Sequence, residues 1–327
     1  MKILIIGSKD RYDKYDPDMP VKDRAEIVFA DRGTPDEALI AAGAGAEVLF
    51  ADAISPVSRH LTENLPRLKM IHSEGVAYDR IDLAAAKERG IYVCNTKGCN
   101  AGAVAEHTIF LMLGLLRNAV EGQEAVVSGQ QIRMKERRMA EGIIELSECS
   151  VGLYGFGDIA KATAQRLAPF GCSVYYTARR RRDEKTEEEY GVRWLAPDDL
   201  VSTCDFISLH TDVNPGTKGM VDAAFLSKMK PEAMLVNTSR GELVDNRALR
   251  EALLTGKIAG FAADTIAPEP VTADNPLVAL PAETMKKVFY SPHLGGITAG
   301  TFRRAHRMMW ENAARIAEGK EPVNQVF

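Results

Sequence analysis

The sequence lacks a surplus of charge of either sign. Its 41 basic and 45 acidic residues leave a formal net charge of −4 across 327 residues. A protein that binds nucleic acid normally carries a clustered basic surplus, because the phosphate backbone is recognised through Lys and Arg. We therefore expect no nucleic-acid partner, and we interpret any basic run in this sequence as a local feature.

Long apolar stretches are also missing. The N-terminal segment MKILIIGSKD has an apolar core of only four residues, Ile3 to Ile6, before charged residues return. A signal peptide needs a longer apolar region, and a membrane-spanning helix needs roughly 20 apolar residues. The sequence therefore predicts that this segment is a first strand and that the protein has no membrane partner.

Cysteine is scarce and irregularly spaced. The five cysteines form no C-x-x-C pair and lie in or beside apolar segments: Cys94, Cys99, Cys149, Cys172 and Cys204. This pattern favours buried, reduced thiols over a disulfide framework or a metal site. We expect a cytoplasmic protein without a metal site.

The sequence does contain a regular alternation of short apolar runs with amphipathic segments. The predicted strands are KILIIG, AEIVFA, EVLFAD, LKMIHS, IYVCN, SVGLYG, CSVYYT, DFISLH, AMLVNT, IAGFAAD and VFYSPH. Segments with helical spacing lie between them, for example DLAAAKERG and NRALREALLTGK. Strands that alternate with helices predict parallel sheets covered by helices on both faces. A chain of this length favours about two such α/β domains.

Two segments in the middle of the chain differ sharply in polarity. Residues 100–120 form a predicted helix that is apolar nearly all round, so we expect it to be buried. Residues 121–146 are polar and rich in Arg and Met. The second segment is interpreted as a solvated or oligomer-contacting arm.

The clearest chemical motif is a glycine-rich turn. Gly155, Gly157 and Ala160 fit the pattern G-x-G-x-x-G/A, directly after an apolar run and at the opening of a helical pattern. Gly155 permits a tight turn, Gly157 lets backbone N–H groups approach a pyrophosphate, and Ala160 allows the helix to pack closely on the strand. The helix N-terminus attracts the anion. The turn therefore predicts a dinucleotide site that also includes Phe156, Asp158 and Ile159.

The run VYYTARRRRDE indicates which dinucleotide is preferred. An NAD site places an acidic residue about 20 positions after the first glycine, at the end of the second strand. Ala178 stands there instead, and four arginines, residues 179–182, follow it. A guanidinium suits a phosphate ester, and the missing carboxylate removes a repulsion. We predict that Arg179 and Arg180 bind the 2′-phosphate of NADP, with NAD as the second cofactor. Arg181 and Arg182 are equally consistent with a solvated loop.

Several motifs in one order run through the length of the chain. They are LKMIHSEGVAYDRIDLAAAKERGIYVCNT, NAGAVAEHT, VGLYGFG, DFISLH, LVNTSRGELVD, AADTIAPEP and SPHLGG. With these motifs the chain resembles the D-2-hydroxyacid dehydrogenases, whose relatives include glyoxylate and hydroxypyruvate reductases. The resemblance implies a homodimer and two doubly wound parallel-sheet domains. A flavodoxin-like substrate domain would contain residues 1–99 and 295–327, and a Rossmann cofactor domain residues 100–294.

The resemblance also implies a catalytic set of Arg240, Glu269 and His293. Arg240 follows a predicted strand, and its guanidinium can hold a substrate carboxylate in two hydrogen bonds. His293 also follows a strand and can exchange a proton near neutral pH. Glu269 would pair with that imidazole, fix its tautomer and favour the protonated form. The implied reaction moves a hydride from NADPH to C2 of a 2-oxo acid while His293 protonates the oxygen.

Other residues are implied to contact the ligands. Backbone N–H groups around Gly75 and Val76 would bind the substrate carboxylate, since glycine permits close approach. The further cofactor contacts are expected at Val104, His210, Thr238, Asp264 and His293. Asp264 is expected to reach the nicotinamide carboxamide, whereas a packing role for His210 is equally consistent with its place at a strand end.

Three residues depart from the family pattern: Glu74, Lys97 and Asp212. An acid at position 74 disfavours an anionic substrate unless it points away or contacts a hydroxyl or an amine. The sequence assigns no role to the other two.

The remaining histidines are interpreted as structural. His72 is expected to pack, and His60, His107 and His306 are expected to be surface or helix-packing residues. Helix packing also accounts for Met309 and Trp310 in the last helical segment.

Two functional classes stay open. The leading one is an NADP-preferring 2-hydroxyacid dehydrogenase that acts mainly as a reductase, with glyoxylate or hydroxypyruvate as the first substrates to test. The other is a non-catalytic binding module that uses the dinucleotide as a conformational ligand, as corepressor relatives of the fold do. Within the enzymes, a short phosphoglycerate dehydrogenase is an alternative against which Glu74 argues. A formate dehydrogenase is expected to have Gln where Glu269 stands. Fold likeness does not choose among these substrates.

Overall fold

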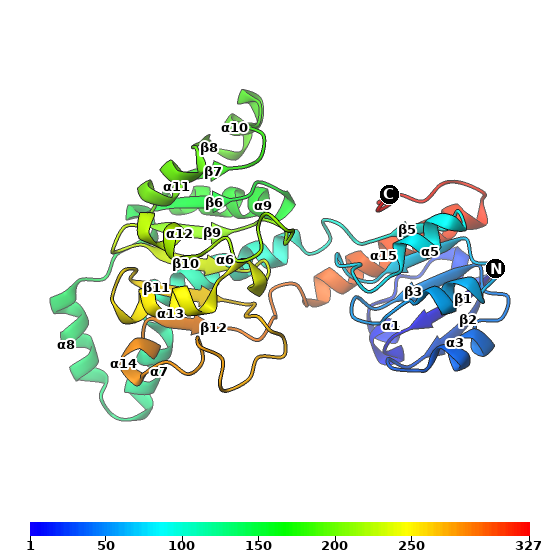
Figure 1. Ribbon diagram of the computed structural model, residues 1–327, viewed down its shortest axis with the longest axis horizontal. Coiled ribbons are helices and arrows are strands. Elements are labelled where there is room, and N and C mark those ends of the chain that lie inside the picture. Colours follow the sequence, from blue (N-terminus) through cyan, green and yellow to red (C-terminus); the bar gives the residue numbers. More distant parts are fainter. The chain divides into compact units, whose positions relative to one another are not determined.

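The computed structural model describes all residues 1–327, which divide into two compact units. The first unit contains Met1–Asn100 and Ile297–Phe327, and the second contains Ala101–Gly296. Each unit has its own parallel sheet and its own helices (Figure 1). The chain therefore enters the second unit once and returns to the first unit for its last segment.

The first unit is built on a five-stranded parallel sheet of order β2-β1-β3-β4-β5. Its strands are β1 (Lys2–Ile6), β2 (Glu26–Ala30), β3 (Val48–Ala51), β4 (Met70–Ser73) and β5 (Tyr92–Cys94). Strands β1 and β3 are buried almost throughout, which explains why they are continuous apolar runs rather than alternating ones. The order 2-1-3-4-5 is that of flavodoxin-like folds.

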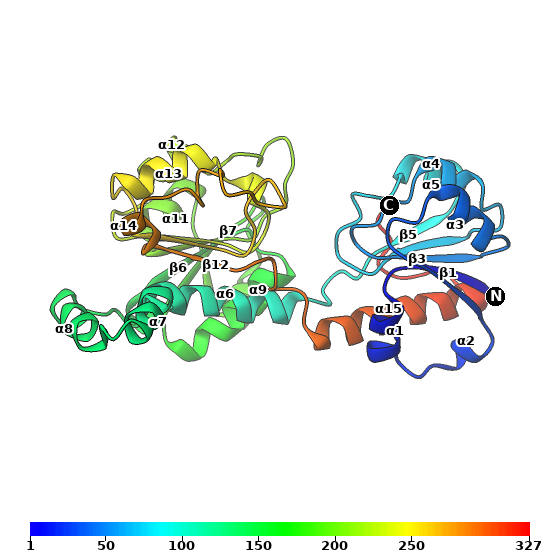
Figure 2. The ribbon, with the colours of Figure 1, turned by 90° about the horizontal axis from the view of Figure 1, so that it is seen from below.

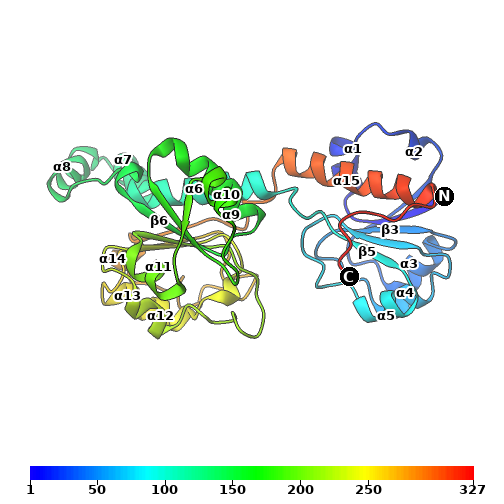
Figure 3. The same cartoon turned by 90° about the horizontal axis from the view of Figure 1, so that it is seen from above.

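Helices cover both faces of this sheet (Figures 2 and 3). One face carries α3 (Asp36–Ala42), α4 (Arg59–Glu63) and α5 (Leu83–Glu88), and the other carries α1 (Lys9–Tyr15), α2 (Pro20–Asp23) and α15 (Ala299–Ala317). The side chains of Ser58, Asp82 and Thr298 begin α4, α5 and α15 by accepting backbone N–H bonds three residues later. Met309 and Trp310 of α15 are fully buried in the core, as predicted.

The second unit is built on a seven-stranded parallel sheet of order β12-β11-β10-β9-β6-β7-β8. Its strands are β6 (Ser150–Tyr154), β7 (Ser173–Thr177), β8 (Val192–Trp194), β9 (Phe206–Leu209), β10 (Met234–Asn237), β11 (Gly260–Ala263) and β12 (Val288–Tyr290). This is the Rossmann order, in which the direction of strand addition reverses between β6 and β9. Ligands of such sheets bind outside the carboxyl ends of the strands at that reversal.

Helices also cover both faces of the second sheet (Figures 2 and 3). One face carries α6 (Ala101–Leu116), α9 (Asp158–Leu167) and α10 (Glu184–Tyr190), and the other carries α11 (Pro197–Thr203), α12 (Ala223–Lys228), α13 (Asn246–Leu254) and α14 (Ala282–Met285). Short 3₁₀ helices span Leu146–Glu148, Ala168–Phe170 and Gly241–Leu243. Most side chains of α6 are buried against α9 and the strands, which confirms the predicted burial of this apolar segment.

Two helices project from the rest of the second unit (Figure 1). These are α7 (Ala119–Val127) and α8 (Gln131–Glu141), which we call the arm. No residue of α8 is buried within the chain. No single helix of the structure is long and apolar enough to span a bilayer; α6 and α7 reach that length and composition only as a pair bent by 58°.

The predicted class, two doubly wound parallel-sheet α/β domains, is confirmed, and every predicted strand is present. Strand β8 is an addition to the predicted set. It has only three residues, and Arg193 at its centre is exposed, so the sequence offers no apolar run there. Because β8 pairs only with β7 at the edge of the sheet, its outward side needs no apolar partner.

Candidate active site

The carboxyl edge of the second sheet collects most of the predicted site residues. Each of six neighbouring strands is followed by one of these residues. They are His293 after β12, Asp264 after β11, Thr238 after β10, His210 after β9, Gly155 after β6 and Ala178 after β7. Because the carboxyl ends of parallel strands meet at one edge, this topology brings together residues that are far apart in sequence.

The glycine-rich turn between β6 and α9 fits a pyrophosphate. Gly155 has φ +105°, and a Cβ there would collide with the carbonyl group of His210. Gly157 precedes the first residue of α9 and has open space where a Cβ would stand. The first backbone N–H groups of a helix have no partner within it, so they are available to an anion. The Phe156 ring turns inward and lies 4.3 Å from the Tyr176 ring, centroid to centroid.

The four arginines after β7 differ in their surroundings. Arg179 and Arg180 are exposed and form no salt bridge. Arg181 is bound to Glu187 by two bonds, Nε to Oε1 at 2.9 Å and Nη2 to Oε2 at 2.8 Å. Arg182 donates from Nη2 to the Phe156 carbonyl oxygen at 3.1 Å. The two arginines that the sequence favours for a phosphate are thus the two that no protein group occupies.

The predicted proton donor is paired with its predicted partner. His293 Nδ1 lies 2.9 Å from Glu269 Oε2, and both side chains are about half exposed. Arg240 follows β10, which is separated from β12 by β11, and is exposed. Its Nη1 donates to the Ser239 carbonyl at 2.9 Å, and it forms no salt bridge. This arrangement leaves His293 Nε2 and most of the Arg240 guanidinium available to a ligand.

A buried carboxylate holds the loop that carries His293. Asp264 Oδ1 accepts from Leu294 N at 2.8 Å and from Ser291 Oγ at 2.6 Å, and Oδ2 accepts from Gly295 N at 2.8 Å. The backbone N–H of His293 donates to the Asp264 carbonyl at 2.9 Å. These bonds hold His293 at φ +57°, a left-handed conformation that residues other than glycine adopt at a cost. Asp264 therefore positions His293, while its expected contact with the nicotinamide stays a prediction.

His107 on α6 belongs to the same cluster, which sequence reasoning missed. Its Nε2 lies 2.6 Å from Ser291 Oγ and 3.2 Å from Asp264 Oδ1. Burial alone would raise the pKa of Asp264, but the bonds from His107, Ser291 and the loop backbone lower it, so the carboxylate is charged. His107 was expected to be a packing or surface residue; a polar side chain inside the apolar motif NAGAVAEHT was the available signal.

The remaining predicted cofactor residues lie close to the same edge. Thr238 is buried, and its Oγ1 lies 2.9 Å from Thr108 Oγ1, which donates in turn to the Val104 carbonyl. His210 Nε2 lies 2.9 Å from Ser208 Oγ. Burial lowers the pKa of His210 to about 4, so its imidazole is neutral at pH 7.

The predicted substrate loop follows β4 in the first unit and is tightly fixed. Ser73 Oγ donates to the Ala77 carbonyl, and Asn95 Nδ2 donates to the Val76 carbonyl at 2.8 Å. A Cβ on Gly75 would stand 2.5 Å from the Ala53 Cβ, so only glycine fits. The Gly75 N–H donates to Ser73 Oγ at 3.2 Å, whereas the Val76 N–H has no partner.

The structure explains why an acid is tolerated at position 74. The Glu74 side chain is only 4% exposed and accepts from Arg11 Nε at 2.7 Å and Arg11 Nη2 at 2.5 Å. His306 Nε2 lies 2.8 Å from Glu74 Oε1, and His306 Nδ1 lies 2.8 Å from Asp16 Oδ1. Glu74 therefore points into a buried, paired cluster. His306, expected only to pack, is an ionic member of it.

The other departures and histidines take no part in either group. His72 is fully buried, with bonds to the Ser73 carbonyl and to Asn312, which confirms a structural role. His60 is exposed beside Glu37. Lys97 and Asp212 are exposed, and nothing in the structure explains them.

The fold and the strand ends define a class of protein that binds NAD(P) on a Rossmann unit. Residues 109–295 match the family model of the D-isomer specific 2-hydroxyacid dehydrogenase, NAD binding domain. The chain therefore belongs to the D-isomer specific 2-hydroxyacid dehydrogenases, which confirms the predicted resemblance.

Similar proteins support this assignment. The chain is 36% identical to a glyoxylate reductase of Thermococcus litoralis, over 83% of this chain and 80% of that protein. It is 34% identical to a glyoxylate reductase of Korarchaeum cryptofilum, over 86% and 82% of the two chains. The crystal structure of the TT0316 protein from Thermus thermophilus matches with a TM-score of 0.83 and 29% identity, covering both chains completely.

Proposed function

We propose that the protein is an NADPH-preferring reductase of small 2-oxo acids, with glyoxylate as the first substrate and hydroxypyruvate as the second. The observation that carries this proposal is the His293–Glu269 pair, at 2.9 Å, on the same sheet edge as an Arg240 without an acidic partner. The two relatives that are named glyoxylate reductase support the choice of substrate.

The second unit provides the residues that would hold the cofactor, whose reduced nicotinamide supplies the hydride. Backbone groups of Gly155 to Ile159, including Phe156, Gly157 and Asp158, would bind the pyrophosphate. Arg179 and Arg180 would bind the 2′-phosphate next to the small Ala178. Val104, His210, Thr238, Asp264 and His293 would line the rest of the site.

His293 would deliver the proton. Glu269 accepts the hydrogen on Nδ1, which fixes the ring and leaves the proton to be transferred on Nε2. The proton would go to the carbonyl oxygen of the 2-oxo acid as the hydride reaches C2, so that a 2-hydroxy acid results.

Arg240 would bind the substrate carboxylate and polarise the neighbouring carbonyl. Its exposed guanidinium can present two parallel N–H donors to a carboxylate. Fixing the carboxylate lowers the entropy cost of the reaction, and the positive charge stabilises the developing oxyanion. Backbone N–H groups at Gly75 and Val76 are the proposed carboxylate donors of the first unit, to which we assign substrate binding. The Val76 N–H has no partner, and the Gly75 N–H would exchange its long bond to Ser73 Oγ for the substrate.

The preference for NADPH follows from what the end of β7 offers. Ala178 carries no carboxylate for the ribose hydroxyls, while Arg179 and Arg180 present free guanidiniums. Arg181 is engaged by Glu187, so we assign it no share in phosphate binding. NADH is the weaker cofactor under this proposal.

The deciding experiment measures the loss of reduced nicotinamide with NADPH and NADH separately, against glyoxylate, hydroxypyruvate, pyruvate and phenylpyruvate. We expect the highest kcat/KM with NADPH and glyoxylate. Faster turnover with NADH would contradict the arginine assignment. Measurable NADPH binding without turnover of any of the four acids would contradict the proposed reaction.

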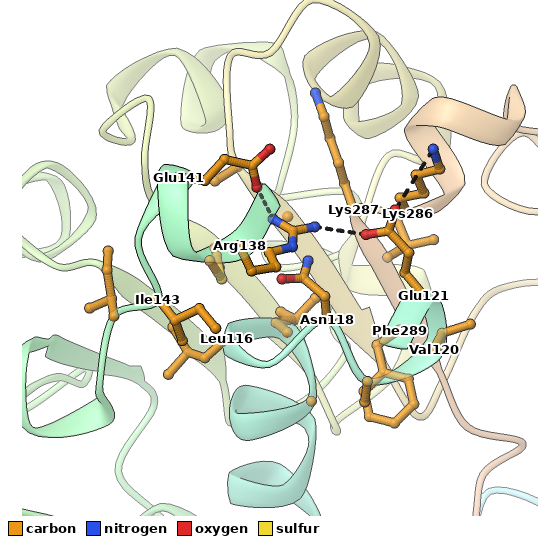
Figure 4. A pocket seen from close by; sticks show the side chains of 18 of the residues that line it. Leu116, Asn118, Val120, Glu121, Arg138, Glu141, Ile143, Lys286, Lys287 and Phe289 are labelled. Atoms are coloured by element: carbon orange, nitrogen blue, oxygen red, sulfur yellow. Dashed lines mark hydrogen bonds and ion pairs between the residues drawn. The ribbon is translucent and has the colours of Figure 1, made fainter. Parts of the chain in front are cut away.

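We further propose a homodimer that forms through the arm. The arm and the residues that follow it expose many apolar side chains: Val120, Val126, Val127, Ile132, Met139, Ile143 and Ile144. At its base a cavity of about 480 Å³ contains Arg138 between Glu121 and Glu141 (Figure 4). None of the proposed catalytic or cofactor residues lines this cavity.

Sedimentation velocity tests the dimer directly. Replacing Val127 and Ile132 by Lys should convert a dimer to a monomer, because each is more than half exposed on the arm. A wild-type protein that sediments as a monomer would contradict the proposal.

We also propose a cytoplasmic location, since all five cysteines are free thiols.

A further inference from the structure

A small cavity of about 220 Å³ lies in the first unit, between the end of α1 and the first turns of α15. Its lining includes Lys14, Tyr15 and Asp16 on one side and Arg303, Arg304 and Arg307 on the other. The two helices lie side by side on the same face of the sheet (Figures 2 and 3). We call this cavity the basic pocket. It shares no residue with the proposed catalytic site.

The charges of the basic pocket are not balanced. Asp16 is its acidic residue, and that carboxylate is already matched, with Oδ2 3.0 Å from Lys22 Nζ and Oδ1 2.8 Å from His306 Nδ1. Arg303 and Arg307 form no salt bridge, and the Lys14 ammonium lies over the Tyr15 ring at 5.2 Å. Four cations therefore share the pocket without a carboxylate of their own, in a chain whose net charge is −4.

Helix stability does not explain this arrangement. The three arginines lie beyond the first turn of α15, so the helix dipole does not favour cations at these positions. Arg303 and Arg307 are four residues apart on one helix face, a spacing at which like charges repel. Arg304 is held by a bond from Nε to the Cys99 carbonyl at 2.7 Å, which leaves its terminal nitrogens free. A bound anion would relieve the repulsion between Arg303 and Arg307.

We propose that the basic pocket binds a tetrahedral oxyanion, either inorganic phosphate or the phosphate group of a small ester. Arginine guanidiniums present paired N–H donors that match phosphate oxygens, and Lys14 adds a point charge from the opposite wall. The volume lies below that of typical drug-sized sites, so it suits a phosphate group with a short organic part. The ligand is distinct from the 2-oxo acid and from the dinucleotide.

Equilibrium dialysis of the full chain against inorganic phosphate at low ionic strength tests the proposal. The proteins carry Arg179→Gln and Arg180→Gln throughout, so that the proposed 2′-phosphate site cannot contribute. We expect one phosphate per chain, displaced by sulfate, and binding weakened roughly tenfold or more by Arg303→Gln with Arg307→Gln. Replacing Arg80 and Lys87 by Gln removes two exposed charges of the same unit outside the pocket and should leave binding unchanged.

Two further measurements make the result decisive. Lys14→Gln, on the opposite wall, should also weaken binding, so the test does not depend on helix α15 alone. Glycerol 3-phosphate is titrated beside inorganic phosphate: tighter binding of the ester identifies a phosphate ester as the ligand, and equal or weaker binding identifies free phosphate. Absence of saturable phosphate binding overturns the proposal, and so does binding that survives the Arg303, Arg307 and Lys14 substitutions.

Discussion

The carboxyl edges of the two sheets carry similar charged side chains, which are unpaired at the edge of one sheet and paired at the edge of the other. At the edge of the second sheet, Arg179, Arg180 and Arg240 are exposed and have no acidic partner. At the edge of the first sheet, Arg11 and Glu74 are largely buried and bound to each other. Unpaired charges at a strand end are available to a ligand, whereas paired charges fix the backbone beside them. The second unit thus presents unpaired charged side chains at its edge, and the first presents a loop fixed by paired charges.

The largest expected effect concerns an exposed side chain at the carboxyl edge of the second sheet. His293→Asn should lower kcat by about 10²- to 10⁴-fold, the usual contribution of a general acid, with little change in NADPH affinity. Asn is the suitable replacement because it tolerates the left-handed backbone at this position. Steady-state kinetics together with NADPH titration by fluorescence measure both quantities. Turnover that survives the substitution removes His293 as the acid.

The substitution Glu74→Gln tests the paired charges at the carboxyl edge of the first sheet. The change leaves Arg11 and His306 without their shared carboxylate in a buried site, and breaking a buried pair costs about 3 kcal/mol or more of stability. Urea unfolding of the full chain should therefore shift to lower denaturant concentration. Glu63→Gln is the matched control, because the Glu63–Arg59 pair is exposed and should contribute less than about 1 kcal/mol. Equal effects of the two substitutions would erase the distinction between the two edges.

The run of residues 179–182 contains unpaired arginines and an arginine bound to Glu187, so it tests the difference between unpaired and paired charges within one loop. Replacing Arg179 and Arg180 by Gln should raise KM for NADPH by roughly 10- to 100-fold, because charge-assisted bonds to a phosphate are lost. KM for NADH should change little. Arg181→Gln, which removes an arginine already bound to Glu187, should have the smaller effect on NADPH. A similar loss for both cofactors would mean that the run is only a solvated loop.

The strands of the second sheet and the residues at their ends could be predicted from the sequence because they belong to local patterns. An apolar run followed by a glycine, an arginine or a histidine predicts a strand and the residue at its end, and each such strand is present. The spacing of Gly155, Gly157 and Ala160 identifies the turn before α9 without any distant contact. Such patterns involve only residues that are close in sequence, so they can be recognised without knowledge of the fold.

The paired groups could not be predicted in the same way. Glu74 is bound to Arg11, 63 residues away, and to His306, 232 residues away. His107 meets Ser291 across 184 residues. No spacing in the sequence records these contacts, because they arise only when separate strands and helices pack together. The acid at position 74 is therefore unfavourable when judged from the sequence, and its partners in the fold reverse that judgement.

The smallest expected effect is a pH dependence that separates two buried histidines of the first unit. Burial alone would lower the pKa of His306, but the carboxylates of Asp16 and Glu74 outweigh burial and raise that pKa. Three other groups face this cluster: Tyr12 stacks on the His306 ring, Arg11 is paired with Glu74, and Lys22 is paired with Asp16. Burial lowers the pKa of His72 to about 4.

The two histidines should act on opposite sides of pH 6.5, the ordinary value for an unfolded chain. His306 binds its proton more tightly in the folded state, so its contribution to stability is complete below pH 6.5 and is lost as the pH rises through the folded-state pKa. His72 is folded in the neutral form, so its contribution is complete above pH 6.5 and is lost as the pH falls toward 4. Thermal unfolding from pH 5 to 9 should therefore flatten on the alkaline side in His306→Gln and on the acidic side in His72→Gln. An unchanged alkaline slope in His306→Gln would mean that the histidine between Asp16 and Glu74 is neutral, and that Arg11 alone balances Glu74.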